Sequence, residues 1–596
     1  MASTIYLVGF LLGFVAILVV VLACVFCVAK KDEAHQLSQA LLDQNYLEFT
    51  PGMKRSDVEE LLVHADRWKC PVCKLDNLDS VCVCSLCGTQ KEERTLNRLR
   101  PLNRRQRAAS SRNEWQRELE PSSGVTWRRQ EQDSSLSVAA FVLHIDPCTP
   151  NRITAPDQLN HATGGDLLTA LTWSPLDDVQ PSLAILGKPL PPSIWLTLLA
   201  ISRMSFSLKY AWFIEQTADL TVAYEKRHLE IKTTRELVFE KAVAMLQDLR
   251  GDSLCAIARC QFQGEAAIDA GAVQREWYML VAQSFVCDTS GLFYLSNRDD
   301  SSYFINPNSS HNFTGQLPHL DAFRAAGRFM GRALLSGQVI PFRLSPVLFK
   351  AHTFCPAMLQ MPLTIEDVET VDPTVYKSLC YILETPQVDE LALTFVASER
   401  IGHEVVQVEL VAGGANIAVD DSNKAYYVEL MTRHWLFGRV ETQLTALLQG
   451  LYDIVPPELL LPFDHKELEL VLCGLSVIDV SDWKTHTMVS LRLRHSRVLD
   501  WFWEIVESMP PVDQATLLQF ATGSSRVPVQ GFKGLTSYDG QICYFALQGV
   551  DYVKGGFPVA HACFNRLDLP LYPTKELLRD ALALIVQSDP TGFSLE

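Results

Sequence analysis

The sequence predicts an α+β protein in which a single transmembrane helix and a small zinc finger precede a large C-terminal region with room for two lobes. Three observations lead to this prediction. An uncharged apolar run fills residues 5–29, two CxxC pairs follow it, and helical and strand-like segments alternate from about residue 228 to 596. A chain of 596 residues also allows about three or four domains.

The overall charge and the cysteine content exclude two broad classes of protein. The formal net charge is −17 at pH 7, so the whole molecule is not a general nucleic-acid binder. The sixteen cysteines lack the clustered spacing of an extracellular disulfide scaffold, and most of them lie in apolar runs. We therefore expect a reducing compartment for most of the chain.

The apolar run over residues 5–29 is long enough to cross a membrane. At 1.5 Å per residue it spans about 37 Å as a helix. A cleaved signal peptide is the competing interpretation, but no basic segment precedes the run and no A-x-A site follows it. Lys30 and Lys31 come directly after the run, and positive charge favours the cytosolic side. The sequence predicts a single-pass membrane protein with its C-terminal domains in the cytosol.

Residues 64–92 contain four cysteines with zinc-ligand spacing: Cys70-x2-Cys73 and Cys84-x2-Cys87. Two CxxC pairs place four thiolates at the corners of a tetrahedron, which is the geometry that Zn²⁺ prefers in structural sites. Such a short segment cannot bury a core, so metal binding would supply its folding energy. The sequence therefore predicts a small zinc finger.

Trp68 and Asn77, together with the four cysteines, make this finger resemble the Ran-binding-protein type. Members of that family bind ubiquitin or single-stranded RNA, or serve as protein docking modules. The ubiquitin-binding members carry Thr-Phe directly after the second cysteine, where this chain has Lys74 and Leu75, and Leu86 supplies an apolar residue between the last two ligands. Ubiquitin and RNA both stay open as partners of the finger.

Two stretches lie between the finger and the C-terminal region. Residues 93–132 are rich in arginine with interleaved serine, glutamine and glutamate, which predicts a solvated and mostly disordered linker. Attraction to RNA or to the anionic cytosolic leaflet is the alternative. Residues 133–227 contain apolar runs and should be ordered, but no motif assigns them. Apolar residues at helical spacing predict a helix near 203–225.

From about residue 228 onward the chain resembles the HECT ubiquitin ligases. The segments that carry the resemblance occur in the order GAVQREWY, GLFYLS, FINPNSS, FRAAGRFMGRALLSGQVI, FDHKELELVLCG, LLQFATGSSRVPVQGF and HACFNRLDLPLYP. The likeness is closest to the branch that carries WW domains, although no WW domain is evident here. It implies an N-terminal lobe over 228–488 and a C-terminal lobe over 492–596, joined by a hinge near Leu491–Leu493.

The same resemblance implies that Cys563 is the nucleophile that carries ubiquitin as a thioester. By itself a cysteine in HACFN is weak evidence, since a lone cysteine near a histidine is usually structural. The family position implies a HECT-type ubiquitin transferase that needs no cofactor for the transfer step. His561 ranks second, as a residue that could tune the thiol. Phe593, fourth from the end, would help to present the acceptor lysine.

Four residues depart from the family pattern or qualify it. Ala562 stands where the family usually has threonine beside the cysteine, which puts the rate in doubt more than the activity. Thr289 and Ser290 replace a tyrosine pair that contributes to a second ubiquitin-binding surface, whereas Phe463 in the matching segment remains. A catalytically weak membrane adaptor, binding ubiquitin or RNA through its finger, is therefore the alternative function.

The resemblance also implies a docking groove for the ubiquitin-conjugating enzyme in a small subdomain of the N-terminal lobe. The expected partners are ubiquitin, that enzyme and protein substrates. The segment DPTVYKSLCYILETPQVDELALTF aligns with the groove. Each apolar residue in it could equally belong to the core. The candidates are Tyr376, Leu379, Tyr381, Leu391 and Phe395.

Overall fold

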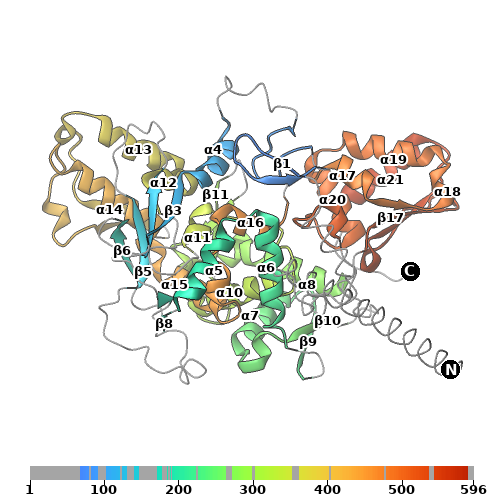
Figure 1. Cartoon of the computed structure of the whole chain (residues 1–596), viewed down its shortest axis with the longest axis horizontal. Coiled ribbons are helices and arrows are strands. Elements are labelled where there is room, and N and C mark those ends of the chain that lie inside the picture. Colours follow the sequence, from blue (N-terminus) through green and yellow to red (C-terminus); the bar gives the residue numbers. More distant parts are fainter. Residues whose placement is uncertain are drawn as a thin grey trace, which may run out of the picture.

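The computed structural model of the chain describes residues 67–79, 82–91, 102–120, 124–129, 140–145, 171–176, 184–185, 188–189, 191–222, 226–263, 272–297, 302–351, 362–401, 404–475, 478–535 and 543–587. The apolar run 5–29 lies outside these residues. Among the helices described, none combines the length and the apolar character needed to cross a bilayer. Three bodies follow one another along the longest axis of the molecule: a small helical subdomain, a large central lobe and a C-terminal lobe (Figure 1).

The central lobe is built around a close crossing of two helices, α10 and α15. A Cβ atom on Gly327 of α10 would lie 1.8 Å from the Leu447 carbonyl oxygen, and one on Gly450 of α15 would lie 1.9 Å from the Arg324 carbonyl oxygen. Glycine at these two positions therefore allows the backbones to touch. The elements of this lobe are β9 (His228–Thr233), α7 (Val238–Asp248), η7 (Gly251–Leu254), β10 (Ile257–Phe262), α8 (Ala272–Val286), η8 (Asp288–Ser290), β11 (Phe293–Asn297), β12 (Ser302–Ile305), α9 (Ser309–Asn312), α10 (His319–Leu335), β13 (Arg343–Leu344), α11 (Pro346–Ala351), α15 (Glu441–Tyr452), η12 (Pro457–Leu459) and α16 (His465–Cys473).

The small subdomain lies at one end of the molecule (Figure 1). Two antiparallel strands and three helices form most of it, and α12 and α14 pack against each other. Its elements are α12 (Ile365–Val371), α13 (Pro373–Glu384), η9 (Val388–Leu391), β14 (Val396–Ile401), β15 (Glu404–Glu409), η10 (Gly414–Asn416), α14 (Lys424–Leu436) and η11 (Gly438–Val440).

The stretch before residue 228 is packed onto the central lobe where it is described. The predicted helix near 203–225 is confirmed as α6, whose Phe213 meets Phe463 edge-on at 5.6 Å. Phe141 exchanges two backbone hydrogen bonds with Leu363, which ties β5 to the segment before α12. The elements of this stretch are β5 (Phe141–Ile145), β6 (Leu171–Pro175), β7 (Ala184–Ile185), β8 (Lys188–Pro189), α5 (Pro192–Ser202) and α6 (Phe206–Ala218).

The predicted disordered linker is wrong for much of residues 93–132. Residues 104–113 form α4 (Arg104–Ser110) and η3 (Ser111–Asn113), and a hairpin of β3 (Trp115–Glu120) and β4 (Gly124–Arg129) follows. Asn103 caps α4 in a capping box with Gln106, a signal that was present in the sequence. Arg105, Arg112 and Arg129 make specific contacts with neighbouring elements, whereas Arg107 and Arg128 are exposed.

The C-terminal lobe carries a four-stranded sheet in the order β16-β17-β19-β18, packed with helices. Only the β18–β19 pair is antiparallel. The lobe lies at the end of the molecule opposite the small subdomain (Figure 1). Its elements are α17 (Val480–Thr485), β16 (Thr487–Val489), α18 (Leu491–Arg494), α19 (Arg497–Ser508), α20 (Pro511–Thr522), η13 (Phe532–Gly534), β17 (Phe545–Val550), β18 (Val559–His561), η14 (Ala562–Phe564), β19 (Arg566–Pro570) and α21 (Lys575–Gln587).

The boundary between the two lobes lies earlier than the sequence suggested. Trp483 of α17 has no exposed surface and stacks on Phe532 of this lobe at 5.0 Å. β16 pairs in parallel with β17, so residues 480–489 belong to the C-terminal lobe. The predicted end of the N-terminal lobe at 488 is therefore too late. Leu493, placed in the predicted hinge, is fully buried.

Candidate functional site

Cys563 lies in a tight connection between two paired strands. β18 ends at His561, η14 carries the chain through Ala562–Phe564, and β19 begins at Arg566. The backbone of Cys563 is the middle of η14, and its side chain lies outside the described part of the structure. Phe564, the next residue, is about half exposed at 52%. We call residues 561–566 the cysteine loop.

Asn565 fixes the shape of the cysteine loop. Its backbone is left-handed, with φ 48° and ψ 38°, and its side chain is fully buried. Asparagine tolerates this conformation better than most residues because its short amide can bond locally. Here the Asn565 Nδ2 donates to the carbonyl oxygen of Cys543 at 2.8 Å. The loop is therefore tied to the residues that lead into β17.

The predicted site residues around Cys563 are only partly brought together. The Nε2 of His561 lies 3.0 Å from an Oδ2 of Asp568 on the neighbouring strand, so the ring is anchored along the sheet. A role of His561 in tuning the thiol stays a prediction. Phe593 lies outside the described residues. Ala562 is buried with 2% exposure, and its carbonyl oxygen accepts a bond from the Asn565 N–H at 3.3 Å.

The five candidates for the conjugating-enzyme groove differ in their exposure to solvent. Leu379 and Phe395 are core residues with exposures of 1% and 2%, which is the alternative that the sequence left open for each candidate. Tyr381 and Leu391 are exposed by 58% and 38%. Tyr376 packs partly buried against the core, and burial raises the pKa of its hydroxyl.

Further exposed apolar residues of the subdomain were missed, among them Ile417 and Tyr426. Tyr426 lies beside Phe395, with ring centroids 5.9 Å apart. Both are outside the segment that the family resemblance singled out. Their exposure, 39% and 50%, was not readable from spacing alone.

The aromatic that was expected to remain for a second ubiquitin surface is covered. Phe463 has 1% exposure and packs edge-on against Phe206 and Phe213 of α6, at 6.3 and 5.6 Å. Ser290 is also buried, with its hydroxyl donating to the Phe285 carbonyl oxygen at 2.9 Å. Phe463 is therefore a core residue under α6.

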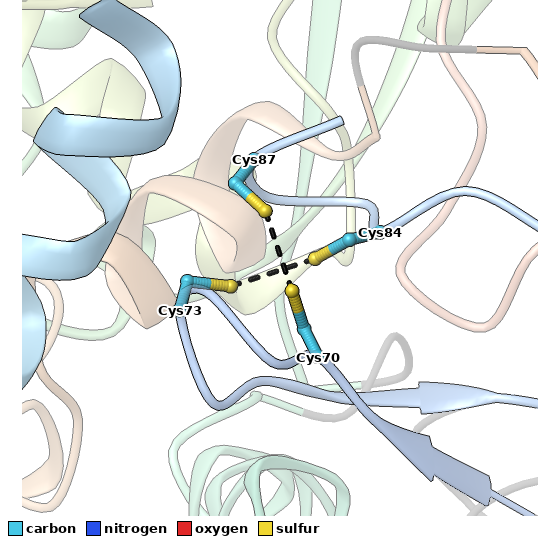
Figure 2. Close-up of side chains that lie close together, drawn as sticks. All are labelled: Cys70, Cys73, Cys84 and Cys87. Atoms are coloured by element: carbon cyan, nitrogen blue, oxygen red, sulfur yellow. Dashed lines mark hydrogen bonds between the residues drawn. The ribbon is translucent and has the colours of Figure 1, made fainter. Parts of the chain in front are cut away.

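The four predicted zinc ligands converge in the finger. All four sulfurs lie within 4.8 Å of one another and all four residues are buried (Figure 2). The Cys70–Cys87 and Cys73–Cys84 sulfur distances are 3.4 and 3.5 Å. A tetrahedral Zn²⁺ with bonds of about 2.3 Å would separate its sulfurs by about 3.8 Å, close to these values. The donor set therefore fits zinc.

The two ligand pairs have the same local backbone. Lys74 and Gly88 each follow a second cysteine and both are left-handed, with φ of 60° and 73°. Each turn is closed by a bond from that residue to the first cysteine of its pair, Lys74 N to Cys70 O at 3.0 Å and Gly88 N to Cys84 O at 2.8 Å. Zinc would be held by two matching turns and would supply the folding energy that so small a segment lacks.

Asn77 explains why the motif includes more than cysteines. Its Nδ2 donates to the Leu75 carbonyl oxygen at 3.1 Å, and its Oδ1 accepts from the Ser85 N–H at 2.9 Å. The side chain therefore links the first turn to the second. Trp68 pairs with Asn77 across β1 (Arg67–Lys69) and β2 (Asp76–Leu78) and is 1% exposed.

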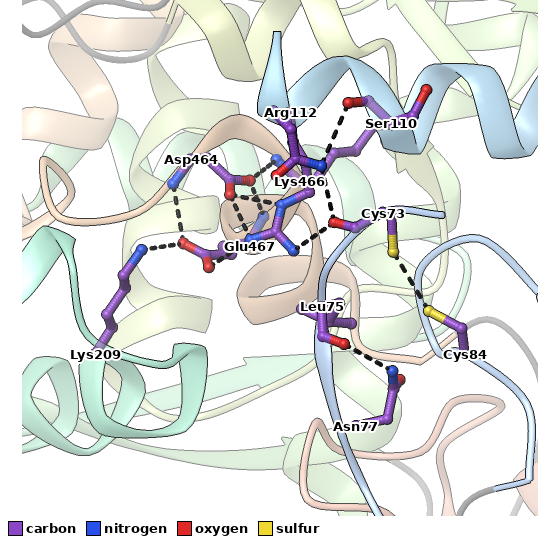
Figure 3. A network of polar contacts seen from close by, with 11 residues as sticks. Cys73, Leu75, Asn77, Cys84, Ser110, Arg112, Lys209, Asp464, Lys466 and Glu467 are labelled. Carbon is purple, nitrogen blue, oxygen red and sulfur yellow. Dashed lines mark hydrogen bonds and ion pairs between the residues drawn. The ribbon is translucent and has the colours of Figure 1, made fainter. Parts of the chain in front are cut away.

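The finger is joined to the central lobe through Arg112, a residue that sequence reasoning missed. The Arg112 guanidinium donates to Asp464 at 2.6 and 2.8 Å and to Glu467 at 2.7 Å, at the first turn of α16 (Figure 3). It also reaches the Cys73 carbonyl oxygen at 3.5 Å. Lys209 of α6 contacts the other oxygen of Glu467 at 2.8 Å. We call Arg112, Lys209, Asp464 and Glu467 the α16 charge cluster.

Burial and charge act in opposite directions within the α16 charge cluster. Burial raises the pKa of Asp464. The positive charges of Arg112 and of nearby cations lower it by more, so the pKa falls to about 2. Burial and the charge of Asp464 raise the pKa of Glu467.

A second contact joins the finger to the C-terminal lobe. The Cys82 N–H donates to Asp479 at 2.9 Å, and Asp479 caps α17.

The face of the finger that the family resemblance connects with ubiquitin is turned inward. Leu75 and Leu86 are 3% and 4% exposed and belong to the molecule's continuous core. Arg105 of α4 donates to the Leu86 and Ser85 carbonyl oxygens at 3.0 and 3.2 Å. Lys74, unlike Leu75 and Leu86, is exposed to solvent, and its Nζ donates to the Pro71 carbonyl oxygen.

Comparison with known proteins places most of the C-terminal half. Residues 279–596 match the family described as HECT-domain (ubiquitin-transferase), which is more than half of the chain. The chain is 34% identical over 379 residues to the E3 ubiquitin-protein ligase Smurf1 of Drosophila melanogaster, covering 63% of this chain and 35% of that protein. It is 36% identical over 366 residues to the E3 ubiquitin-protein ligase pub3 of Schizosaccharomyces pombe, covering 61% and 45%.

A third relative is the E3 ubiquitin-protein ligase UPL1 of Arabidopsis thaliana, at 34% identity over 411 residues, covering 68% of this chain and 11% of that protein. The match therefore spans less than half the length of each of these relatives. The predicted likeness to HECT ligases is confirmed at the level of the family.

Proposed function

Because the chain belongs to the HECT ubiquitin-transferase family, we propose that it is a ubiquitin-protein ligase in which Cys563 carries ubiquitin as a thioester. The observation that carries the proposal is the match over 279–596, which includes the cysteine loop. The named relatives are themselves called E3 ubiquitin-protein ligases. The loop's place at a turn of a rigid sheet suits a residue that must meet two different partners.

The proposed reaction has two acyl transfers. The Cys563 thiolate attacks the carbonyl carbon of the thioester between ubiquitin and the conjugating enzyme, and that enzyme's cysteine leaves as a thiolate. A substrate lysine amine then attacks the new thioester, the Cys563 thiolate leaves, and the amine proton passes to solvent. An amide is formed and no cofactor is consumed. One difficult transfer is thereby divided into two easier ones.

The test uses the full chain in detergent with ubiquitin, activating enzyme, a conjugating enzyme and ATP. We expect a ubiquitin adduct that reductant removes, that Cys563→Ala abolishes and that Cys563→Ser converts into a reductant-resistant ester. Cys287→Ala, at an exposed cysteine of the other lobe, should leave the adduct intact. An adduct that survives Cys563→Ala, or none with several conjugating enzymes, refutes the proposal.

We further propose that the conjugating enzyme binds the small subdomain through the exposed Tyr381 and Leu391. When exposed aromatic and leucine side chains gather in one subdomain, they mark a surface that binds a partner. Tyr381→Ala and Leu391→Ala should slow formation of the adduct about tenfold at low conjugating-enzyme concentration and much less at saturation. Leu196→Ala, at another exposed leucine, serves as the control. An equal slowing at saturation contradicts a docking role.

We also propose that the ligase acts at a membrane, on the support of the uncharged run 5–29 followed by Lys30 and Lys31. The full chain should stay in the membrane pellet after alkaline carbonate extraction. A variant with Leu18→Arg and Val21→Arg should be released. Release of the unaltered chain contradicts the proposal.

We propose that zinc binding by the finger has a structural role. The burial of Leu75 and Leu86 gives no support to ubiquitin binding through those residues.

A further inference from the structure

Arg275 is a residue of the central lobe whose side chain reaches the cysteine loop of the other lobe. Its Nη1 donates to the Asn565 Oδ1 at 3.1 Å and to the Thr522 carbonyl oxygen at 3.0 Å. Its Nη2 reaches the Ala562 carbonyl oxygen at 3.5 Å. One guanidinium therefore contacts the residue before Cys563 and a residue two positions after it.

The arginine is held on a rigid base. Arg275 lies in the first turn of α8, and the next two residues are buried in the central lobe. Glu276 accepts from Arg235 at 2.7 Å, and the Trp277 ring meets Tyr278 and Phe329 at 5.1 and 6.1 Å. The planar fork of an arginine can serve several acceptors at once in a fixed direction. A loop held by it is held relative to the central lobe.

The acceptors on the other side are equally well fixed. Asn565 is fully buried, and its amide is shared between Arg275 and the Cys543 carbonyl oxygen. Thr522 is the last residue of α20, directly before the left-handed Gly523. The bonds of Arg275 can therefore form only when the C-terminal lobe lies against α8.

This arrangement keeps the cysteine loop away from the proposed docking subdomain. The subdomain with α12–α14 and the C-terminal lobe lie at opposite ends of the molecule's longest axis (Figure 1). Receiving ubiquitin at the subdomain would require the C-terminal lobe to leave α8, which breaks the Arg275 bonds. The bonds are compatible with the later step, in which a held loop presents its thioester to an amine.

We propose that Arg275 is a positioning residue that holds the cysteine loop against the central lobe for transfer to the acceptor amine and is not used in loading. The proposal rests on the proposed function of Cys563. It predicts that the two acyl transfers respond differently to one substitution. A residue needed merely for folding would impair both steps together.

The experiment measures the two steps separately in single turnover with the full chain. Loading is followed from conjugating enzyme to Cys563, and discharge is followed from pre-formed adduct to free lysine. For Arg275→Ala we expect loading within about twofold of the unaltered chain and discharge slowed about tenfold, a change of about 1.4 kcal/mol in the barrier. Arg275→Lys, which keeps the charge but not the fork, should recover part of the discharge rate.

Two further variants keep the test decisive. Arg203→Ala removes an exposed arginine at the end of α5 and should change neither step. Arg275→Ala combined with Asn565→Gly should slow discharge less than the product of the two single effects, because both remove one contact. Faster loading with unchanged discharge would mean that Arg275 merely restrains a resting state, and it overturns the proposal. Equal loss of both steps also overturns it, whereas absence of any adduct refutes the proposed function itself.

Discussion

The finger and the cysteine loop share a local device and differ in where their support comes from. In the finger, left-handed Lys74 and Gly88 each follow a ligand, and in the cysteine loop the left-handed Asn565 follows Cys563 by two residues. The finger's ligands all lie within residues 70–87 and close on one another. The cysteine loop is supported by Arg275, 290 positions from Asn565 in the sequence. A self-contained turn can be recognised by spacing, whereas a turn with remote supports cannot.

The largest expected effect tests whether the finger is closed by four thiolates. Cys73→Ser removes one ligand, and structural zinc sites contribute about 10–16 kcal/mol of apparent binding energy in zinc-finger peptides. We expect the zinc content of the purified full chain, measured by elemental mass spectrometry, to fall from about one per chain to near zero. Cys82→Ser, at the exposed cysteine beside the group, should keep its zinc. Zinc loss in Cys82→Ser would break the assigned ligand set.

The second effect tests whether the finger region and the central lobe form one unit. Arg112→Gln leaves the buried Glu467 and the partly exposed Asp464 with Lys209 as the remaining cation of the α16 charge cluster. Breaking a buried pair by removing one partner costs about 3–5 kcal/mol, and we expect a loss of that size in the free energy of unfolding by urea. Arg107→Gln, at an exposed position on α4, is the matched control. Similar stability of the two variants would contradict a joint unit.

The same variant has a pH signature. In the unaltered chain the pKa of Asp464 is depressed to about 2. A depressed folded pKa contributes stability that is present above the unfolded value of about 4 and is lost as the pH falls towards 2. The stability of Arg112→Gln should therefore fall less steeply between pH 4 and 2. Glu467, whose pKa is raised, acts with the opposite sign above pH 4, so the lower window isolates Asp464.

The third effect concerns the left-handed residue of the cysteine loop. Asn565→Ala and Asn565→Gly both remove the amide that bonds Cys543 and Arg275, but alanine must also adopt a φ of 48°. We expect alanine to be less stable than glycine by about 1–2 kcal/mol, because a left-handed backbone costs an L-residue that amount. Thermal unfolding of the C-terminal lobe, followed by tryptophan fluorescence, measures the difference. Equal stability would mean that the loop relaxes out of this conformation.

The smallest effect concerns the position beside Cys563. The Ala562 side chain is buried, and the partners of this residue use its backbone carbonyl oxygen. Ala562→Thr adds two atoms in a closed space and should change single-turnover discharge by less than about threefold. A gain of more than tenfold would show that the missing hydroxyl limits the rate, and the cysteine loop would then depend on a local group after all.

The same difference between local and remote support explains which features the sequence predicted. The convergence of the four finger cysteines, the helix near 203–225 and the likeness to the HECT family were readable because spacing or a contiguous motif carries them. Arg112 and Arg275 were not, because their partners lie hundreds of positions away and nothing in the arginine itself marks a buried pair. The composition of residues 93–132 led to a wrong prediction for the same reason. A run of charged residues is expected to be solvated unless carboxylates from distant parts of the sequence pair with it. The lobe boundary lies earlier than predicted because Trp483 stacks on Phe532, and the periodicity of the sequence does not reveal such a contact.

The α16 charge cluster also sets an order of events during synthesis. Arg112 and Asp464 are 352 positions apart. At about 5–20 residues per second, the ribosome makes Asp464 roughly 20–70 s after Arg112. Zinc can close the finger during that interval, yet the carboxylates that receive Arg112 do not exist until most of the chain has emerged. The contacts that join Arg112 to the central lobe can therefore form only late in synthesis.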